Sequence, residues 1–564
     1  MSIQRIADTV VNTDVLVVGG GLAGCCAAAK AAEHGLNVTL LEKAVPERSG
    51  DAAQGIDHFE GFFPRDGATT LKVVQFEEWK LGRYGARFPN LNLKYKIYEN
   101  CFWILEELER FGVPMKWDDG DYLWMTFPVP TWTGERVSLR VHWQNVKPRL
   151  AEAVKKRKVN VIERSTLVDL LTDNGRVIGA TAVNSRTGQF IVIKAKATIL
   201  GTGRFNRSYD AESSAPWKYK MNYHFFPGSI SGDGMAAAYR AGADLVGMDM
   251  GGWMFRMHDE KTISYGNFTV NDGIPMHTYS WTGKETLNPN AARYLELERE
   301  GLTPLYHNLS HLPDDFQKRM EVAYVDERMV SFPIAEERGF NPRTHFYLMM
   351  PIRPTGFYRT CGVNIDEDFQ SSLKGLFAIG GTCANMGSVT GACGSGLLVG
   401  DNIPKFVNEA PESSIDEDQV ENQKRIALAP ASEKDGTEYL ELEATIRQLN
   451  ARFAGIEKNE GGLREGLRRL ETLQRVFLPR LMARTPHYLV GCLEVRNILE
   501  LSRIHMQGAL LRRETRGNFL RLDCPGLDEK LDNKCLIQRQ KNGQIFTEYI
   551  DAIGLKPEYS KGGK

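Results

Sequence analysis

The alternation of apolar and polar residues near the start of the chain predicts a strand, a helix and a second strand. Residues 14–18 (DVLVV) form the short apolar run that a buried parallel strand needs. A glycine cluster and an alanine-rich helical stretch to about residue 34 follow, and a second apolar run covers residues 37–41. This order is a βαβ unit, in which a glycine-rich turn can bind the phosphates of a dinucleotide.

The pattern continues with alternating helices and strands. Helical periodicity is found at 91–112 and 145–157, and a strand is predicted at 159–162. Residues 167–194 have the alternation of a β-meander, and the strand 197–203 (ATILGTG) returns to the nucleotide-binding domain. These elements together predict an α/β fold.

The second half of the chain changes character twice. Residues 246–350 are rich in aromatic, Met, His and Pro residues with weak periodicity, which is typical of an inserted domain that covers a site. Residues 376–380 (LFAIG) form a further strand before a glycine-rich helix. After an acidic linker at 412–418, the sequence is charged and helical.

Composition narrows the class of protein. A chain of 564 residues is too long for one core, so roughly two to four domains are expected. Its 70 Lys and Arg residues nearly balance 71 Asp and Glu residues, which does not favour nucleic acid or an anionic membrane as a partner. No apolar run reaches the roughly 18–20 residues of a membrane span, and no signal peptide is visible. The nine cysteines lie at no zinc or iron–sulfur spacing, so we expect a cytoplasmic protein with reduced thiols and no metal of its own.

The glycine turn after the first strand predicts a dinucleotide site. Gly19 allows the tight turn, Gly21 lets the backbone approach a pyrophosphate, and Gly24 lets the helix pack closely on the strand. The N-terminus of this helix offers free N–H groups to the phosphates. Glu42 ends the second strand, where its carboxylate can accept both hydroxyls of an adenosine ribose. This leaves FAD or NAD as the cofactor.

The segment after the second strand decides for FAD. A plain NAD domain does not need another phosphate and ring loop directly after the acidic residue, and residues 42–55 (EKAVPERSGDAAQG) have the composition of one. Lys43, Arg48, Ser49 and Gly50 are predicted to donate hydrogen bonds along the pyrophosphate and the ribityl chain. The small segment Ala53-Gln54-Gly55 is predicted to let the backbone approach a flat ring closely.

The chain resembles the flavoprotein subunits of the fumarate reductase, succinate dehydrogenase, aspartate oxidase and adenylylsulfate reductase family, and is most similar to the adenylylsulfate reductase α-subunit type. The resemblance covers nearly the whole chain in the family's order. Its motifs are GGGLAG (19–24), EKAVPERSGDAAQG (42–55), GTG (201–203), SGDGMAAAYRAGADL (231–245), GLFAIGG (375–381), GACGSGLLVGD (391–401) and RRETRGNFLRLDCPGLDE (512–529).

The resemblance implies a Rossmann-like FAD-binding domain, an inserted α+β capping domain and a C-terminal helical domain. The expected bounds are 1–245 and 351–410 for the two parts of the FAD domain, 246–350 for the cap and 411–564 for the helical domain. By position, the residues expected at FAD are Gly19, Gly21, Leu22, Ala23 and Gly24 at the glycine turn, Thr166 and Leu167 near the adenine, Thr202, Gly203 and Asp233 along the ribityl chain and ring, and Gly381, Ser395, Gly396 and Leu397 at the flavin through a helix N-terminus.

Departures from the family pattern are equally informative. Gly50 stands where relatives with covalent FAD place a His, so we predict non-covalent FAD. The substrate His falls on Phe357 and the substrate Arg on about Gly391, so a small dicarboxylate cannot be held by the same pairing. The E-R-S-G and A-Q-G spellings and the Cys361-Gly362 pair are similar to adenylylsulfate reductase. However, the substrate-side His of that enzyme also falls on Phe357, and its Asn falls near Glu60.

Polar residues expected over the flavin are the catalytic candidates. Arg256, which falls near the capping-domain Arg of the adenylylsulfate reductase type, can stabilise a developing anion or relay a proton; a salt-bridged structural role is the alternative. His58 follows the flavin loop, although a lone His is as often structural. Tyr358 can act as an acid, and Arg353 and Arg359 can bind an anionic group. Weaker candidates are His277, His345 and Tyr347.

The sequence therefore predicts an FAD-dependent oxidoreductase. It would transfer two electrons between flavin N5 and a small organic, anionic substrate, reducing or forming an activated C=C bond, and would exchange electrons with an iron–sulfur or ferredoxin-like subunit. Homo- or hetero-oligomers are compatible with this prediction. The alternatives are a self-contained oxidase of the aspartate oxidase type, the α subunit of adenylylsulfate reductase itself, and a scaffold in which FAD is only structural.

Overall fold

A seven-stranded sheet forms the centre of the region that is expected to bind FAD. The computed structural model describes residues 3–54, 58–60, 69–82, 87–117, 120–128, 135–140, 145–208, 228–250, 254–258, 277–286, 291–308, 310, 347–352, 361–384, 386–455 and 457–560. The strand order is β6-β2-β1-β9-β8-β7, with β17 also paired to β9. The strands are β1 (Thr9–Val18), β2 (Val38–Leu41), β6 (Asn160–Ile162), β7 (Ser165–Asp173), β8 (Arg176–Asn184), β9 (Phe190–Leu200) and β17 (Leu376–Ala378).

Parallel pairing brings distant parts of the chain to one edge of this sheet. β6, β2, β1, β9 and β17 pair in parallel, whereas β7, β8 and β9 form an antiparallel meander. Val15, Leu16 and Val17 in β1 are fully buried, as expected for a parallel strand covered on both faces. Because β17 joins the sheet beside β9, the glycine-rich segment after residue 378 returns to the first βαβ unit.

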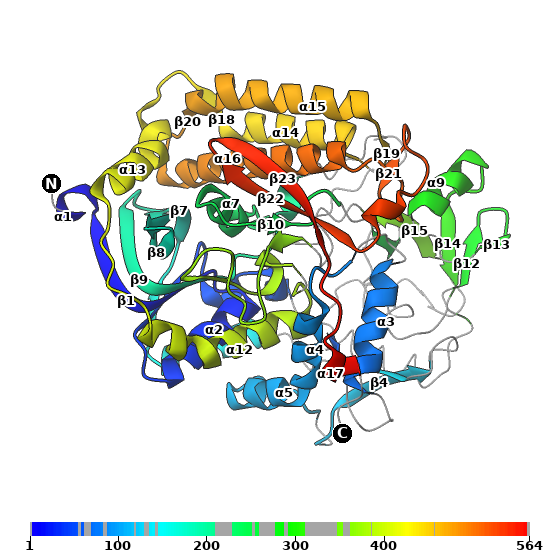
Figure 1. The fold of residues 1–564 in the computed structure, drawn as a ribbon, viewed down its shortest axis with the longest axis horizontal. Coiled ribbons are helices and arrows are strands. Elements are labelled where there is room, and N and C mark those ends of the chain that lie inside the picture. Colours follow the sequence, from blue (N-terminus) through cyan, green and yellow to red (C-terminus); the bar gives the residue numbers. More distant parts are fainter. Residues whose placement is uncertain are drawn as a thin grey trace, which may run out of the picture.

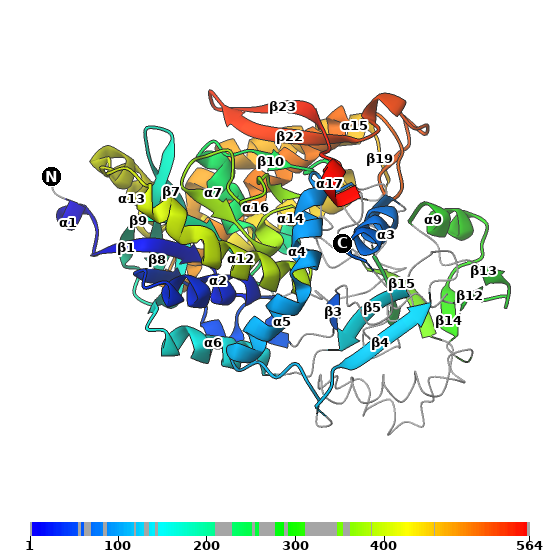
Figure 2. The ribbon, with the colours of Figure 1, turned by 60° about the horizontal axis from the view of Figure 1, so that its bottom comes forward.

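The helix of this βαβ unit packs closely against the helix that follows β17. α2 (Leu22–Glu33) follows β1, and α12 (Val389–Asn408) follows β17. They run side by side in both views (Figures 1 and 2). A Cβ at Gly396 would lie 2.2 Å from the Ala23 carbonyl oxygen, so only glycine permits this approach. The contact fixes the two parts of the FAD-binding region against each other.

Two further small sheets lie outside the seven-stranded sheet, one within the predicted cap and one formed by residues of the predicted FAD domain. One has the order β11-β15-β14-β12-β13 and the other β3-β5-β4, and Figure 2 shows them on the same side of the molecule. Their elements are β3 (His58–Glu60), β4 (Leu123–Pro128), β5 (Glu135–Arg140), β11 (Met254–His258), β12 (His277–Ser280), β13 (Glu285–Thr286), β14 (Leu305–Asn308) and β15 (Tyr347–Ile352), with helix α9 (Ala291–Arg299).

The C-terminal region packs helices on the region that is expected to bind FAD, and it also contains a β-hairpin. Its hairpin, β22 (Lys534–Lys541) and β23 (Gln544–Asp551), joins a four-stranded sheet with β10 (Leu245–Val246) and β16 (Gly362–Val363), and lies beside α16 in Figures 1 and 2. The helices are α13 (Glu417–Ser432), α14 (Tyr439–Phe453), α15 (Glu460–Thr472), α16 (Pro486–Leu511) and α17 (Pro557–Ser560). Short paired strands are β18 (Thr437–Glu438) with β20 (Leu481–Met482), and β19 (Glu457–Lys458) with β21 (Leu520–Arg521).

Three predicted elements differ from those observed. The helix predicted at 91–112 is two helices, α4 (Leu91–Glu99) and α5 (Cys101–Arg110), because the Asn100 side chain turns back to donate to the Lys96 carbonyl. The strand predicted at 197–203 is the end of β9, continuous from Phe190. The predicted all-helical C-terminal segment contains the hairpin β22–β23. The remaining helices are α1 (Ile3–Ile6), α3 (Thr70–Gly82), α6 (Val146–Lys156) and α7 (Asp233–Arg240).

The described residues include no helix that is both long and apolar enough to span a membrane.

Candidate cofactor and active site

The first glycine turn is shaped by backbone contacts that admit no side chain. Gly19 has φ +99°, and a Cβ there would lie 2.5 Å from the Gly201 carbonyl oxygen. A Cβ at Gly24 would lie 1.7 Å from the Gly19 carbonyl oxygen. Leu22 and Ala23 form the first turn of α2, and its N-cap Gly21 makes no side-chain cap. The N-terminus of α2 therefore presents amide groups at the end of β1, as a dinucleotide turn requires.

Glu42 lies where the ribose of the cofactor is predicted. This residue directly follows β2, and its buried carboxylate accepts hydrogen bonds from the amides of Gly20 and Ala44. The Ser165 amide donates to the Glu42 carbonyl at 2.9 Å, which brings the start of β7 alongside. Thr166 follows there, and its buried hydroxyl has no hydrogen-bond partner within the described residues. A buried unpaired hydroxyl beside the ribose acid fits a nucleotide, because such groups ordinarily have partners.

The predicted flavin loop, residues 42–55, folds onto the glycine turn. It contains two short 3₁₀ helices, η1 (Pro46–Arg48) and η2 (Asp51–Gln54). The Ser49 hydroxyl donates to the Gly20 carbonyl at 2.8 Å, and a Cβ at Gly50 would lie 3.0 Å from Gly21 Cα.

Two other predicted residues of the flavin loop, Arg48 and Ala53, are exposed. Ala53 and the exposed Arg48 lie on these 3₁₀ helices. The side chain of Gln54 and all of Gly55 lie outside the described residues. The loop thus places Ser49 and Gly50, rather than Arg48, at the predicted pyrophosphate position.

A second group of glycine-rich turns, called the cradle below, is formed around Thr202–Gly203, Gly234 and Gly380–Thr382. Side-chain hydroxyl groups accept hydrogen bonds from its backbone amides. Thr382 accepts from the Gly203 amide at 2.9 Å, and Thr202 accepts from the Gly234 amide at 3.1 Å. Ser395 accepts from the Gly380 amide at 3.0 Å. These bonds connect the end of β9, the start of α7 and the turn before α12, which are the segments expected at the flavin.

Four other residues expected at FAD lie in or beside the core. Thr166 and Leu167 are buried in β7, and Gly396 and Leu397 are buried at the crossing of α12 with α2. Gly381 lies against the Arg204 side chain. Direct contact of these residues with FAD stays a prediction.

Lys43 and Asp233 form an ion pair that links the cradle to α16. Their charged atoms are 2.6 Å apart, and Lys43 also lies 2.7 Å from Glu494. Although burial alone would lower the pKa of Lys43, the two carboxylates raise it above its ordinary value. Burial likewise opposes ionisation of Asp233, but Lys43 and a hydrogen bond from Asn497 keep the pKa of Asp233 low. An ammonium has three donors. The donors of the Lys43 ammonium go to protein acceptors, which include the Ser229 carbonyl and the Ser231 hydroxyl.

For the catalytic candidates that the structure describes, it gives the strand and the register position. Arg256 lies in β11, opposite Met350 of β15, and His58 lies in β3, opposite Arg140 of β5. Tyr347 is at the start of β15 and His277 at the start of β12. Arg353, Tyr358, Arg359 and His345 lie outside the described residues. Their convergence on one site stays a prediction.

Two cationic residues at the cradle were not among the sequence-predicted site residues. Lys147 in α6 is 1% exposed and contacts the Gly20 carbonyl, and Arg204 follows Gly203 and donates to the Gly387 carbonyl. A signal for Lys147 exists in the sequence, because residues 147, 150, 151 and 154 share one helix face and the other three are apolar.

Comparisons with known proteins agree with this architecture. The family model "FAD binding domain" matches residues 14–264, and the model "Fumarate reductase flavoprotein C-term" matches residues 443–554. The chain is 24% identical to a fumarate reductase (CoM/CoB) subunit of Methanothermobacter marburgensis, over 94% of this chain and 98% of that protein. It is 23% identical to the L-aspartate oxidase of Vibrio cholerae, over 92% of this chain and 97% of that protein.

Solved structures show the same fold. Adenylylsulfate reductase from Archaeoglobus fulgidus superposes with a TM-score of 0.78 at 22% identity, covering 97% of this chain and 96% of that chain. E. coli quinol fumarate reductase also gives 0.78, at 18% identity, covering 97% of this chain and 98% of that chain.

The fold, the two glycine cradles and the family matches define an FAD-dependent oxidoreductase. The chain carries the FAD-binding domain and the C-terminal domain of fumarate reductase flavoproteins, and its relatives include fumarate reductase flavoprotein subunits. The predicted family, fold class and cofactor are thereby confirmed.

Proposed function

We propose that this chain is the flavoprotein subunit of an enzyme that reduces or forms an activated C=C bond in a small organic anion other than fumarate or succinate. The observation that carries the proposal is the environment of Gly391 in the first turn of α12. A Cβ at this position would lie 3.0 Å from the backbone of Met386, so a side chain here, such as the substrate arginine that the family pattern places at about this position, would crowd that backbone. Phe357 replaces the other substrate-binding side chain.

The residues of this chain would bind FAD without a covalent link. The α2 turn and the Ser49–Gly50 segment would hold the pyrophosphate, Glu42 the ribose, and the cradle around Thr202 and Gly380 the flavin. Bound FAD supplies two-electron transfer at its N5 atom. Arg256 on β11 would bind the anionic group of the substrate in the cap, with Tyr358 as a proton donor.

A separate iron–sulfur subunit would exchange electrons with the flavoprotein. Relatives such as the 8-methylmenaquinol:fumarate reductase flavoprotein subunit of Wolinella succinogenes are named as subunits, and the similarity extends over 96% of this chain. None of the nine cysteines, all of which lie among the described residues, forms a disulfide, and they have no iron–sulfur spacing. The proposal therefore assigns the clusters to a partner, and it includes a cytoplasmic location, where thiols stay reduced.

A second candidate is a self-contained oxidase that passes its electrons to O₂. It is favoured by the similarity to L-aspartate oxidase over 92% of this chain. The two functions predict different rates of reoxidation of the reduced flavin in air, because only the oxidase uses O₂ as its electron acceptor.

Reoxidation of the chemically reduced holoprotein separates these functions. Under anaerobic conditions, we expect a panel of α,β-unsaturated carboxylates to contain an acceptor that restores the oxidised flavin spectrum, while fumarate and adenylylsulfate do not. Rapid reoxidation in air with no organic acceptor would favour the oxidase, and reoxidation by fumarate would contradict the proposal. Acid precipitation should leave the yellow colour in the supernatant, because the flavin is not covalently bound.

A further inference from the structure

Lys147 is a buried cation at the back of the glycine turn. It lies in the first turn of α6, which packs against η1 and α2, and its side chain is only 1% exposed. Its ammonium donates to the Gly20 carbonyl and to Cys25 Sγ at 3.4 Å. Both acceptors are uncharged. Within the described residues, no carboxylate oxygen lies within ion-pair distance of Lys147 Nζ.

Two partly buried cations near the cofactor cradle are paired with carboxylates. Lys43 lies between Asp233 and Glu494. Arg240 contacts Asp169 at 2.6 Å as well as Glu500. A buried charge ordinarily needs such a partner, because its desolvation is otherwise uncompensated. Lys147 thus has no carboxylate in ion-pair contact within the described residues, and the buried carboxylate of Glu42 nearby is bound to the amides of Gly20 and Ala44 instead.

The position of Lys147 shows where the missing negative charge would come from. Gly20 lies between Gly19 and Gly21 of the predicted pyrophosphate turn, and its carbonyl also accepts from Ser49 at 2.8 Å and Cys25 at 3.2 Å. The glycine turn and the flavin loop therefore meet at the atom that Lys147 contacts. The diphosphate of FAD is the dianion expected on the other side of this turn.

We propose that Lys147 is a positioning residue that sets the affinity for FAD. Its charge would balance the diphosphate through the low-dielectric turn, and its hydrogen bond to Gly20 would fix the amides that face the phosphates. The proposal rests on FAD binding, which the family establishes, and is independent of the substrate. A failure of this proposal therefore leaves the proposed function untouched, and the reverse also holds.

The test compares three substitutions at this position in FAD-stripped protein titrated with FAD. Lys147→Met removes the charge and the hydrogen bond, Lys147→Gln keeps a donor, and Lys147→Arg keeps the charge. We expect the Kd for FAD, measured by flavin fluorescence, to rise about 10- to 100-fold with Met and Gln and less than tenfold with Arg. Wild-type affinity in Lys147→Gln would overturn the proposal.

Thermal unfolding of the apoprotein distinguishes this role from a purely structural one. Replacing an unbalanced buried charge by an apolar side chain of similar length should leave the Tm of the apoprotein unchanged or higher. Lys30→Met on α2 is the matched control, because Lys30 is paired with Glu107 at 3.0 Å. It should lower the Tm and leave the Kd for FAD unchanged. If Lys147→Met lowers the Tm of the apoprotein as Lys30→Met does and keeps the wild-type Kd, Lys147 has only a structural role. Should Lys147→Met fail to fold, the Gln and Arg variants decide by their Kd values alone.

Discussion

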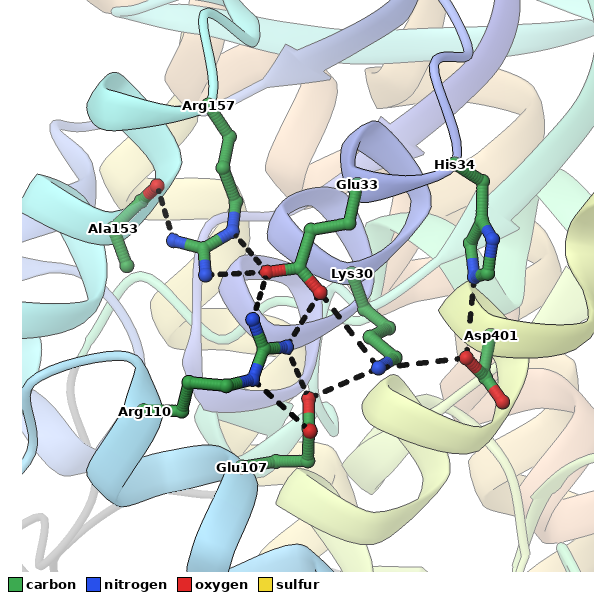
Figure 3. Close-up of polar contacts among 8 residues, drawn as sticks. All are labelled: Lys30, Glu33, His34, Glu107, Arg110, Ala153, Arg157 and Asp401. Atoms are coloured by element: carbon green, nitrogen blue, oxygen red, sulfur yellow. Dashed lines mark hydrogen bonds and ion pairs between the residues drawn. The ribbon is translucent and has the colours of Figure 1, made fainter.

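The two ends of α2 handle charge in opposite ways. At the C-terminal end, the side chains of Lys30 and Glu33 join a network with Arg110, Arg157 and Asp401 in which each cation has a carboxylate partner (Figure 3). At the N-terminal end, the buried Lys147 contacts only uncharged atoms among the described residues. The first end is complete within the polypeptide, whereas the second is completed by a ligand.

The largest expected effect comes from the glycine turn at the N-terminal end. Gly24→Ala would place a Cβ 1.7 Å from the Gly19 carbonyl oxygen, so the turn must distort. We expect a loss of roughly 4 kcal/mol or more in the free energy of unfolding. The purified protein should carry little FAD, as measured by its absorbance near the flavin bands.

Gly35, just beyond the C-terminal end of α2, provides the control for this substitution. It has φ +76°, but a Cβ there would meet no atom within 4 Å. Gly35→Ala should therefore cost only about 1 kcal/mol of left-handed backbone strain and keep full FAD content. Equal FAD loss in both variants would show that the two ends of α2 do not differ.

An intermediate effect is expected where the cradle meets α16. Glu494→Gln removes a buried carboxylate that pairs with Lys43 and Arg207. We expect the free energy of unfolding to fall by roughly 3 kcal/mol, because Lys43 and Arg207 each lose one of their two carboxylate partners. Urea denaturation of the holoprotein measures this loss. Glu465→Gln, which disrupts only exposed pairs on α15, should cost less than about 1 kcal/mol.

The C-terminal network should give a smaller effect that depends on pH. Burial would raise the pKa of Glu33, but the hydrogen bonds from Arg110 and Arg157 outweigh it and lower this pKa to about 2. A lowered carboxyl pKa stabilises the fold above the usual pKa of about 4.5, and this stabilisation is lost as the pH falls towards 2. Glu33→Gln should therefore destabilise the protein by about 1 kcal/mol at pH 7. The difference from wild type, measured by urea denaturation, should shrink below pH 4. A difference that is constant with pH would contradict the ionic origin.

Local sequence signals predicted the βαβ unit well because β1, the glycine turn and β2 are adjacent in the chain. The continuity of β9 was missed because Lys194 and Lys196 interrupt its apolar pattern. In the structure, Lys196 pairs with Asp14 at 2.9 Å, and Lys194 donates to the Ser413 carbonyl. The hairpin β22–β23 was missed although Asn542 and Gly543 form the kind of turn that joins such strands.

Contacts between distant residues limited the prediction of the site. The pairing of Lys43 with Glu494 joins residues more than four hundred positions apart, and no local pattern encodes it. The burial of Lys147 depends on the flavin loop folding over α6, although its place on an apolar helix face was visible. A lysine on a helix ordinarily extends into solvent, so pattern alone assigned it no role.

The rise in Tm that FAD produces in the apoprotein tests the contrast between the two ends of α2 most directly. Wild type, Glu33→Gln and Lys147→Met are each measured without and with saturating FAD. The account predicts that Glu33→Gln lowers both Tm values and keeps the FAD-induced rise. It predicts that Lys147→Met keeps the Tm of the apoprotein and reduces the rise at equal FAD concentration. A parallel drop of both Tm values in Lys147→Met, with an unchanged rise, would contradict it.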